Sequence, residues 1–110
     1  MTQVVLGGVY TAKFPYLDSK EDKVRPIIVV TKSFGPYRVI GVVPIFSKPY
    51  KEPVDFLVSG WRDTGLVKPS VARVHRFTTL LLIDLGSQLG KLNNSDTNKL
   101  KESMREYLGL

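Results

Sequence analysis

Hydrophobic residues in the first three quarters of the chain fall into short runs that are separated by turn-forming residues. Several runs alternate apolar with polar positions, which is the period of a half-buried β-strand, and Gly, Pro, Ser and Asp lie between them. The segments predicted to be strands are residues 7–14, 25–31, 37–46, 54–59, 65–77 and 78–83. Short strands at such close spacing favour a small β-barrel or β-sandwich.

The C-terminal residues follow a helical period instead. Ser95 is predicted to cap the start of a helix, and Gly109 is predicted to end it. The apolar positions that recur on one face of this helix are Leu100, Met104, Tyr107 and Leu108. We expect this stripe to pack against the β-structure, so the prediction is a mainly β domain, residues 1–110, with one C-terminal helix.

An arginine stands at the entrance to the most apolar of these strands. Pro26 holds Arg25 in an extended conformation, and a proline is expected at the start of a strand rather than in its middle. Residues 27–30 then form a continuous apolar run, which is typical of a strand covered on both faces. Arg25 is therefore a charge on the rim of a rigid element, and a structural ion pair with Glu21 or Asp22 is one explanation for it.

Two polar residues follow the apolar run at 42–46. Ser47 and Lys48 come where the chain is predicted to leave the sheet, and a hydroxyl beside a lysine suits a phosphate group. A serine in a turn also needs no function, because serine is a common turn former. On its own, this pair is a weak indication of an anion site.

The segment around residue 73 alternates more regularly. A period of two predicts that Ala72 and Val74 face inward, while Arg73 and His75 lie side by side on the outward face. An ordinary solvent-exposed strand face is an equally good interpretation of this pattern.

The composition excludes several classes of protein. The chain has no cysteine, and its one histidine, His75, is not accompanied by clustered carboxylates, so neither a disulfide nor a metal site is expected. No apolar run approaches the roughly 18 residues of a membrane span. The start, MTQVVLGG, lacks the charged and apolar regions of a signal peptide, so we expect a cytoplasmic protein with no membrane partner.

The net charge of +6 is unevenly distributed along the chain. Residues 1–76 contain 12 Lys and Arg against 6 Asp and Glu, whereas residues 77–110 contain 4 against 4. A basic excess confined to one part of the chain, with a sequence pI near 9.7, favours a polyanionic partner, and a merely solvated basic surface is an equally good explanation.

Taken in order, these segments resemble the MazF/PemK (Kid-like) toxins of type II toxin–antitoxin systems. The stretches that carry the resemblance are GGVYTAKFPYLD, Arg25-Pro26 before IIVVT, VPIFS, GLVKPSVARVHR and LGKLNNSDTNKLKESMREYLGL, which together span nearly the whole chain. The resemblance implies a small SH3-like barrel with a C-terminal helix that forms a homodimer. It further implies an endoribonuclease that cuts single-stranded mRNA and arrests translation until an acidic antitoxin covers its binding groove.

The resemblance also implies roles for individual residues. Arg25 matches the family's catalytic arginine, whose planar fork of donors suits a phosphate that gains charge in the transition state. Attack of a 2′-hydroxyl on its own phosphate needs a base, a proton donor for the leaving oxygen and a cation, and none of these requires a metal or cofactor. We assign Arg73 to the phosphate, Ser47 to a hydrogen bond with phosphate or hydroxyl, and His75 to proton transfer as a neutral base. RNA contacts are assigned to Lys20, Lys23, Phe46, Lys48, Lys68 and Arg76.

The chain departs from the family pattern at several of these positions. Phe46 stands where the family usually has threonine, His75 stands where many members have an acid, and the loop before Arg25 reads SKEDK. Two other classes of function therefore stay open. One is a non-catalytic toxin of the same fold, like the CcdB type that traps DNA gyrase, and the other is an RNA-binding barrel whose cleavage activity has lapsed.

Overall fold

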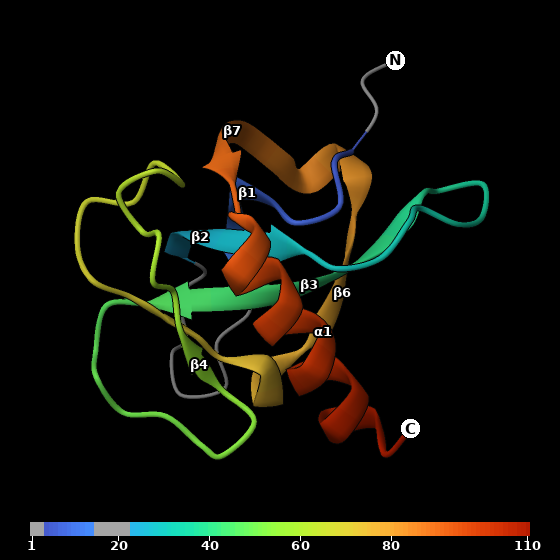
Figure 1. Ribbon diagram of the computed structural model, residues 1–110. Helices are drawn as coiled ribbons and strands as arrows, with labels where there is room; N and C mark the ends of the chain where they lie inside the picture. Colours follow the sequence, from blue (N-terminus) through green and yellow to red (C-terminus); the bar gives the residue numbers. More distant parts are fainter. Residues whose placement is uncertain (1–3, 15–22) are drawn as a thin grey trace.

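A strongly curved antiparallel sheet with one α-helix lying across it makes up the protein (Figure 1). The structure is a computed structural model that describes residues 4–14 and 23–110. Its strands are β1 (Gly8–Phe14), β2 (Lys23–Val29), β3 (Val39–Phe46), β4 (Phe56–Leu57), β5 (Val71–Ala72), β6 (Thr78–Leu81) and β7 (Leu85–Lys91). Its helices are the 3-10 turns η1 (Val74–Arg76) and η2 (Leu82–Asp84) and the α-helix α1 (Asn94–Leu108). The predicted mainly β class with a C-terminal helix is confirmed.

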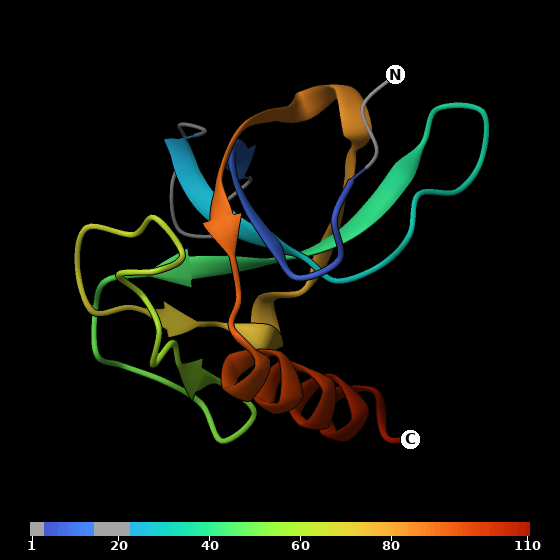
Figure 2. The same cartoon turned by 45° about the horizontal axis from the view of Figure 1, so that its top comes forward.

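The order of the strands explains why the sheet curls. The main path runs β4-β5-β3-β2-β1-β7, and β6 pairs with the first half of β3. Because η2 joins β6 directly to β7, the ladder from β6 through β3, β2 and β1 to β7 bends round on itself (Figure 2). The result is a barrel-like sheet that is not closed, which agrees with the predicted small barrel.

Apolar side chains from the two faces of the central strands form two separate clusters. The cluster on the side of α1, called the helix-side cluster here, consists of Val9, Ile28, Val43, Ile45, Phe56, Val58, Leu66, Ala72, Val74, Leu92 and Leu100. The cluster inside the curl, called the barrel-side cluster, consists of Tyr10, Ala12, Phe14, Ile27, Val29, Ile40 and Val42. Alternate residues of β2 and β3 therefore go to opposite clusters, as expected for strands buried on both faces.

Two of the predicted strands are much shorter than expected. In the predicted strand 65–77, only Val71–Ala72 pairs, because residues 60–66 form tight turns and the chain enters η1 at Val74. The predicted strand 54–59 shrinks to Phe56–Leu57, since the strand with which it pairs in the described part of the chain is the equally short β5. The prediction of a long alternating strand around Arg73 is wrong.

One strand was not predicted at all. β7 contains two glycines, and its residues Gly86, Ser87 and Gln88 are exposed, so it lacks the apolar alternation of a typical strand. It is a strand because it pairs with β1, with register shifts on either side of Tyr10. Long-range pairing, rather than local pattern, determines this element.

Pro26 lies in the interior of β2, contrary to the expectation that it starts the strand. The ladder to β1 runs across it, with Thr11 opposite Pro26, while the ladder to β3 begins only at Ile27. The first residues of β2 are thus paired on one side, and a proline is tolerated where one side of a strand has no ladder.

The terminal helix begins two residues earlier than predicted. Its N-cap is Asn93, whose side-chain oxygen accepts a hydrogen bond of 2.7 Å from the Asp96 amide, so the predicted cap at Ser95 is wrong. Gly109 ends the helix as predicted, at a φ of 75° that suits glycine. The expected packing of the apolar stripe holds for Leu100 and partly for Met104.

The last turn of α1 packs less than expected. Tyr107 and Leu108 are 40% and 53% exposed, although the Tyr107 ring lies 6.4 Å from that of Phe77. Within residues 4–14 and 23–110, no helix is long and apolar enough to span a bilayer.

Candidate functional site

Neighbouring strands bring Arg25, Phe46 and Arg73 to one end of the sheet. Ile27 of β2 pairs with Pro44 of β3, and the Arg73 amide donates to the Pro44 carbonyl at 3.0 Å. Two residues beyond the Ile27–Pro44 pair, β2 carries Arg25 and β3 carries Phe46. Because alternate side chains of a strand point the same way, both belong to the face of the barrel-side cluster. Arg73 follows a residue of the helix-side cluster and precedes another, so it also points to this face.

The Arg73 side chain is buried against aromatic rings. Its guanidinium lies 4.2 Å from the centre of the Phe46 ring and 5.3 Å from that of Tyr50, and the residue is only 8% exposed. Arg76 stacks on the same Phe46 ring at 5.5 Å. The expectation that Arg73 faces outward is therefore wrong: the strand ends at Ala72, and the rings cover the side chain.

The Arg73 guanidinium keeps unused hydrogen-bonding capacity. Its Nε atom is buried and has no hydrogen-bond partner among the residues that the structure describes. A buried N–H without an acceptor is costly, whereas an anion at this point would accept from it and share the positive charge. The arrangement therefore suits an anionic ligand.

His75 lies not beside Arg73 but against a buried carboxylate. Its Nδ1 atom is 2.7 Å from Oδ2 and 3.0 Å from Oδ1 of Asp55, and its backbone amide donates to Oδ1 at 3.1 Å. The Asp55 side chain is fully buried, and the His75 side chain is 29% exposed. The expected pairing of Arg73 with His75 on one outward strand face is wrong, because residues 74–76 form the turn η1.

Tyr50 connects the Asp55–His75 pair to Arg73. Its hydroxyl donates to the Glu52 carboxylate, and this hydrogen bond raises the pKa of Tyr50 above its usual value of 10.0. Desolvation and the charges of Glu52 and Asp55 raise this pKa further, while the Arg73 charge lowers it. The Glu52 amide also donates to Oδ2 of Asp55 at 2.8 Å. The groups joined in this way, called the strand-end cluster here, are Phe46, Tyr50, Glu52, Asp55, Arg73, His75 and Arg76.

The remaining predicted site residues have varied positions. Arg25, expected on the rim of its strand, is the third residue of β2 and is exposed where the described part of β2 pairs with β1 but not with β3. Ser47 and Lys48 are exposed directly after β3. Lys68 is exposed in the segment before β5. Lys20 lies outside the described residues, as do Glu21 and Asp22, the proposed ion-pair partners of Arg25, and the side chain of Lys23. The assignment of RNA contacts to these lysines stays a prediction.

Three members of the strand-end cluster were not found from the sequence: Tyr50, Glu52 and Asp55. The available signal was Asp55, an acid inside the apolar stretch VDFLV, because a buried carboxylate requires partners. The sequence did not identify the partner, since His75 is 20 residues further along the chain. Over the described part of the chain, no group of three or more His, Cys, Asp or Glu side chains is arranged to hold a metal ion.

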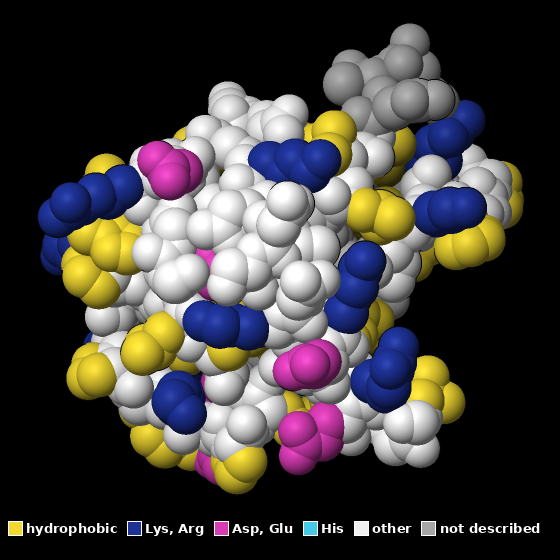
Figure 3. Space-filling view, in the orientation of Figure 1, with side chains coloured by type: hydrophobic (Ala, Val, Ile, Leu, Met, Phe, Trp, Pro, Cys, Tyr) yellow, Lys and Arg dark blue, Asp and Glu magenta, His cyan; other side chains and the backbone are white. Residues whose placement is uncertain are grey.

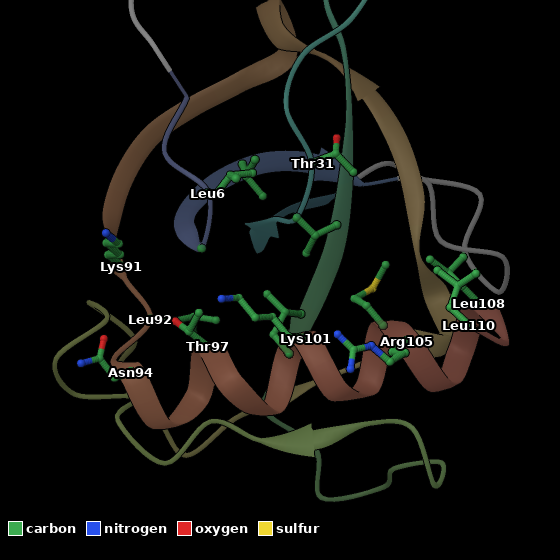
Figure 4. Close-up of a pocket in the computed structure, with 15 residues that line it drawn as sticks. Leu6, Thr31, Lys91, Leu92, Asn94, Thr97, Lys101, Arg105, Leu108 and Leu110 are labelled. Atoms are coloured by element: carbon green, nitrogen blue, oxygen red, sulfur yellow. The ribbon is translucent and has the colours of Figure 1, made fainter.

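A separate hollow lies between α1 and the adjoining parts of β1, β2 and β7. Its volume is about 570 Å³, and Figure 4 shows Leu6 and Thr31 facing Lys101 and Arg105 of the helix across it. None of the described site residues lines it, so the chemistry of the strand-end cluster is distinct from this hollow. On the face that carries α1, basic side chains are spread among hydrophobic ones rather than gathered into one patch (Figure 3).

One known protein family matches almost the whole chain. Residues 6–108 match the family described as PemK-like, MazF-like toxin of type II toxin-antitoxin system. The chain belongs to this family. The MazF/PemK resemblance drawn from its motifs is therefore confirmed over almost its full length.

Solved structures of MazF toxins share the fold. The "Mycobacterium tuberculosis toxin MazF-mt6" is 24% identical, with a TM-score of 0.72 over 94% of this chain and 97% of that chain. An "Endoribonuclease in complex with its cognate antitoxin from Mycobacterial species" is 20% identical, with a TM-score of 0.74 over 97% of this chain and 96% of that chain. The "MazE-MazF (Form-II) from Deinococcus radiodurans" structure is 16% identical, with a TM-score of 0.74 over 100% and 99%. A comparison with curated protein sequences gave no match.

Proposed function

We propose that this MazF-like toxin is an endoribonuclease that cuts single-stranded mRNA in the cytoplasm and acts as a homodimer. A cognate acidic antitoxin would cover the same surface and block it. The observation that carries the proposal is the buried guanidinium of Arg73, whose Nε has no partner among the described residues, within a cluster that also presents a half-buried imidazole. Family membership and the endoribonuclease name of a solved relative support the same reading.

The proposed reaction is attack of an RNA 2′-hydroxyl on the adjacent phosphate. His75 accepts the hydroxyl proton, the 2′-oxygen forms a bond to phosphorus, and the bond from phosphorus to the 5′-oxygen breaks. The leaving 5′-oxygen takes a proton from the imidazolium or from water, which gives a 2′,3′-cyclic phosphate and a 5′-hydroxyl end. Arg25 and Arg73 stabilise the charge that grows on the phosphoryl oxygens, and Ser47 donates a hydrogen bond.

Contacts outside the reacting phosphate hold the RNA strand. Aromatic rings stack on bases, and lysine and arginine side chains neutralise phosphates along a single strand. In this proposal the residues with these roles are Lys20, Lys23, Phe46, Lys48, Lys68 and Arg76.

A second candidate is RNA binding without cleavage. It is favoured by the stacking of Arg73 on Phe46 at 4.2 Å, because a guanidinium held under a ring is less accessible to a phosphate. Phe46 also takes the place of the hydroxyl that the family pattern has at this position.

Incubation of the purified protein with a long single-stranded RNA in the presence of EDTA tests both candidates. The proposal expects discrete fragments that carry 5′-hydroxyl and 2′,3′-cyclic phosphate ends. An Arg25→Ala variant purified in the same way controls for contaminating ribonucleases and should give no fragments. Retention of uncut RNA on the protein would support the second candidate and reject the first, and neither binding nor cleavage would reject both.

A further inference from the structure

Asp55 holds the imidazole of His75 from one side only. The carboxylate is fixed in its own orientation by two backbone amides: that of Glu52 donates to Oδ2 at 2.8 Å, and that of His75 donates to Oδ1 at 3.1 Å. Both oxygens also lie within 3.0 Å of Nδ1 of the ring. The carboxylate position therefore does not depend on the ring, whereas the ring position depends on the carboxylate.

The chemistry of this contact determines which ring nitrogen is available. An ionised carboxylate only accepts hydrogen bonds, so Nδ1 carries a hydrogen in both the neutral and the charged imidazole. The atom that gains and loses a proton is then Nε2. Asp55 is fully buried while the His75 side chain is 29% exposed, so Nδ1 faces the buried carboxylate and we infer that the opposite edge of the ring faces solvent.

We propose that Asp55 is a positioning residue: it fixes His75 in the Nδ1–H tautomer and turns Nε2 outward as the proton-exchanging atom of the site. This inference rests on the proposed ribonuclease function for its catalytic part. Charged and titratable neighbours of the pair are Tyr50, Glu52, Arg73 and Arg76. Arg73 takes no part in orienting the ring, since its guanidinium is held by the Phe46 and Tyr50 rings.

The tautomer can be measured without any RNA. The chain contains one histidine, so long-range ¹H–¹⁵N correlation spectra of the labelled protein show a single imidazole. Above the pH at which the ring loses its charge, the wild type should show a protonated Nδ1 and an unprotonated Nε2. Asp55→Asn replaces one acceptor oxygen by a donor and should shift the ring toward the Nε2–H tautomer, which is the form that free histidine prefers.

Asp96→Asn is the matched control for this experiment. Among the described residues Asp96 is the other buried aspartate, and its side-chain oxygens accept from Ser59 and Gly60 in the turn after β4 rather than from His75. This variant should leave the imidazole signals of the wild type unchanged. An Nε2–H tautomer in the wild type, or identical spectra for wild type and Asp55→Asn, would overturn the proposal.

A double-mutant cycle tests whether the positioning matters for the reaction. Asp55→Asn should lower kcat by at least about 10-fold with little change in KM, because general acid–base catalysis by a positioned side chain is worth roughly 10²- to 10⁴-fold. In a His75→Ala background, the same substitution should cost less than about twofold, since the group through which Asp55 acts is gone.

The outcomes of the two experiments are separable. If Asp55→Asn lowers the rate equally in both backgrounds, Asp55 has only a structural role and the proposal is rejected. If the wild type cuts no RNA, the proposed function fails, and the tautomer spectra alone decide whether Asp55 positions the ring.

Discussion

Asp55 and Asp96 are both fully buried aspartates, yet their partners differ in kind. Asp96 accepts hydrogen bonds from the Ser59 amide, the Ser59 hydroxyl and the Gly60 amide at 3.0, 2.8 and 2.9 Å. Asp55 also accepts from backbone amides, but its third partner is the titratable ring of His75, which reaches solvent. Asp96 therefore holds two segments of the fold together through amides and a hydroxyl. Asp55 instead contacts a partly exposed imidazole, a group that can exchange protons with a ligand or with solvent.

The region around Asp96 is locally complete. Asn93 caps the helix by accepting from the Asp96 amide, and Asp96 in turn holds residues 59 and 60 against the start of α1. Gly60 is required there because a Cβ atom would run into the Asn93 amide. Both oxygens of the buried Asp96 carboxylate and its amide have partners in this junction, as expected of an element that stabilises the fold.

The strand-end cluster is organised differently. Within residues 4–14 and 23–110, the buried Nε of Arg73 has no partner and only Nδ1 of the His75 ring has one. Such incomplete hydrogen bonding lowers the free energy of unfolding and is typical of sites that complete their contacts with a ligand. The comparison therefore predicts that substitutions in the cluster affect activity more than stability, and that substitutions at the helix junction do the reverse.

The largest effect is expected from Arg25→Ala. Loss of a donor that stabilises transition-state charge should lower the cleavage rate by at least about 10²-fold. Arg25 is exposed, so the free energy of unfolding should change by less than about 0.5 kcal/mol. Single-turnover cleavage and thermal unfolding measure the two effects. Arg62→Ala, which removes an exposed arginine stacked on Trp61 at 5.0 Å, is the control and should keep the full rate.

This assignment fails under either of two results. A variant at Arg25 that unfolds would show that the side chain stabilises the sheet. A variant that cuts RNA at nearly the normal rate would show that the guanidinium does not meet the phosphate.

The second effect concerns stability alone. Asp96→Ala leaves two backbone amides and a hydroxyl without their acceptor, which should lower the free energy of unfolding by about 2 to 4 kcal/mol. For a domain of this size, the melting temperature should fall by roughly 10 °C or more. The cleavage rate per folded molecule should stay within about twofold, because the junction makes no contact with the proposed reaction.

Asp63→Ala is the matched control for that experiment. Asp63 is an exposed aspartate in the same turn region, and its loss should leave the melting temperature nearly unchanged. An Asp96→Ala variant as stable as Asp63→Ala would remove the distinction between the two buried carboxylates.

The sequence alone predicted the elements that have a strong local period. The strands around 8–14, 23–29 and 39–46 and the terminal helix follow from apolar patterns. The order of weak motifs predicted the family, which the comparison confirms. These features depend on neighbouring residues in the chain, so the sequence contains the information directly.

The features that escaped prediction depend on distant pairing. β7 pairs with β1, which lies more than 70 residues earlier in the chain. The Ser87 amide also donates a hydrogen bond to the Thr11 hydroxyl across this pair. The short β5 turns Arg73 inward, and Asp55 meets His75 across 20 residues. No local period reports such contacts. The catalytic roles of Arg25, Ser47, Arg73 and His75 stay predictions.

A smaller effect is expected where the cluster departs from the family pattern. Phe46→Thr removes the ring that lies 4.2 Å from the Arg73 guanidinium and restores a hydroxyl. The lost cation–π contact should lower the free energy of unfolding by about 0.5 to 1 kcal/mol, while kcat for RNA cleavage should rise several-fold as the guanidinium becomes accessible.

Phe46→Leu separates the two causes of that gain. It removes the ring without supplying a hydroxyl, so a gain shared by both variants reports release of Arg73. A gain confined to threonine reports the hydroxyl, and a loss in both variants would mean that the ring serves RNA binding more than it hinders Arg73.

The smallest effect is a change in the ionisation of Tyr50, which senses one of the two buried carboxylates and not the other. Its pKa is raised above 10.0 first by the hydrogen bond to Glu52 and also by the charge of Asp55, and it is lowered by Arg73. Glu52→Gln should therefore lower the Tyr50 pKa most, Asp55→Asn should lower it less, and Arg73→Gln should raise it. Asp96→Asn should leave it unchanged. Ultraviolet titration of each variant, with its Tyr50→Phe counterpart subtracted to remove the other tyrosines, measures these shifts. Equal shifts for Asp55→Asn and Asp96→Asn would show that the Tyr50 pKa responds to general loosening of the fold. They would disprove that the charge of Asp55 acts on Tyr50 within the strand-end cluster.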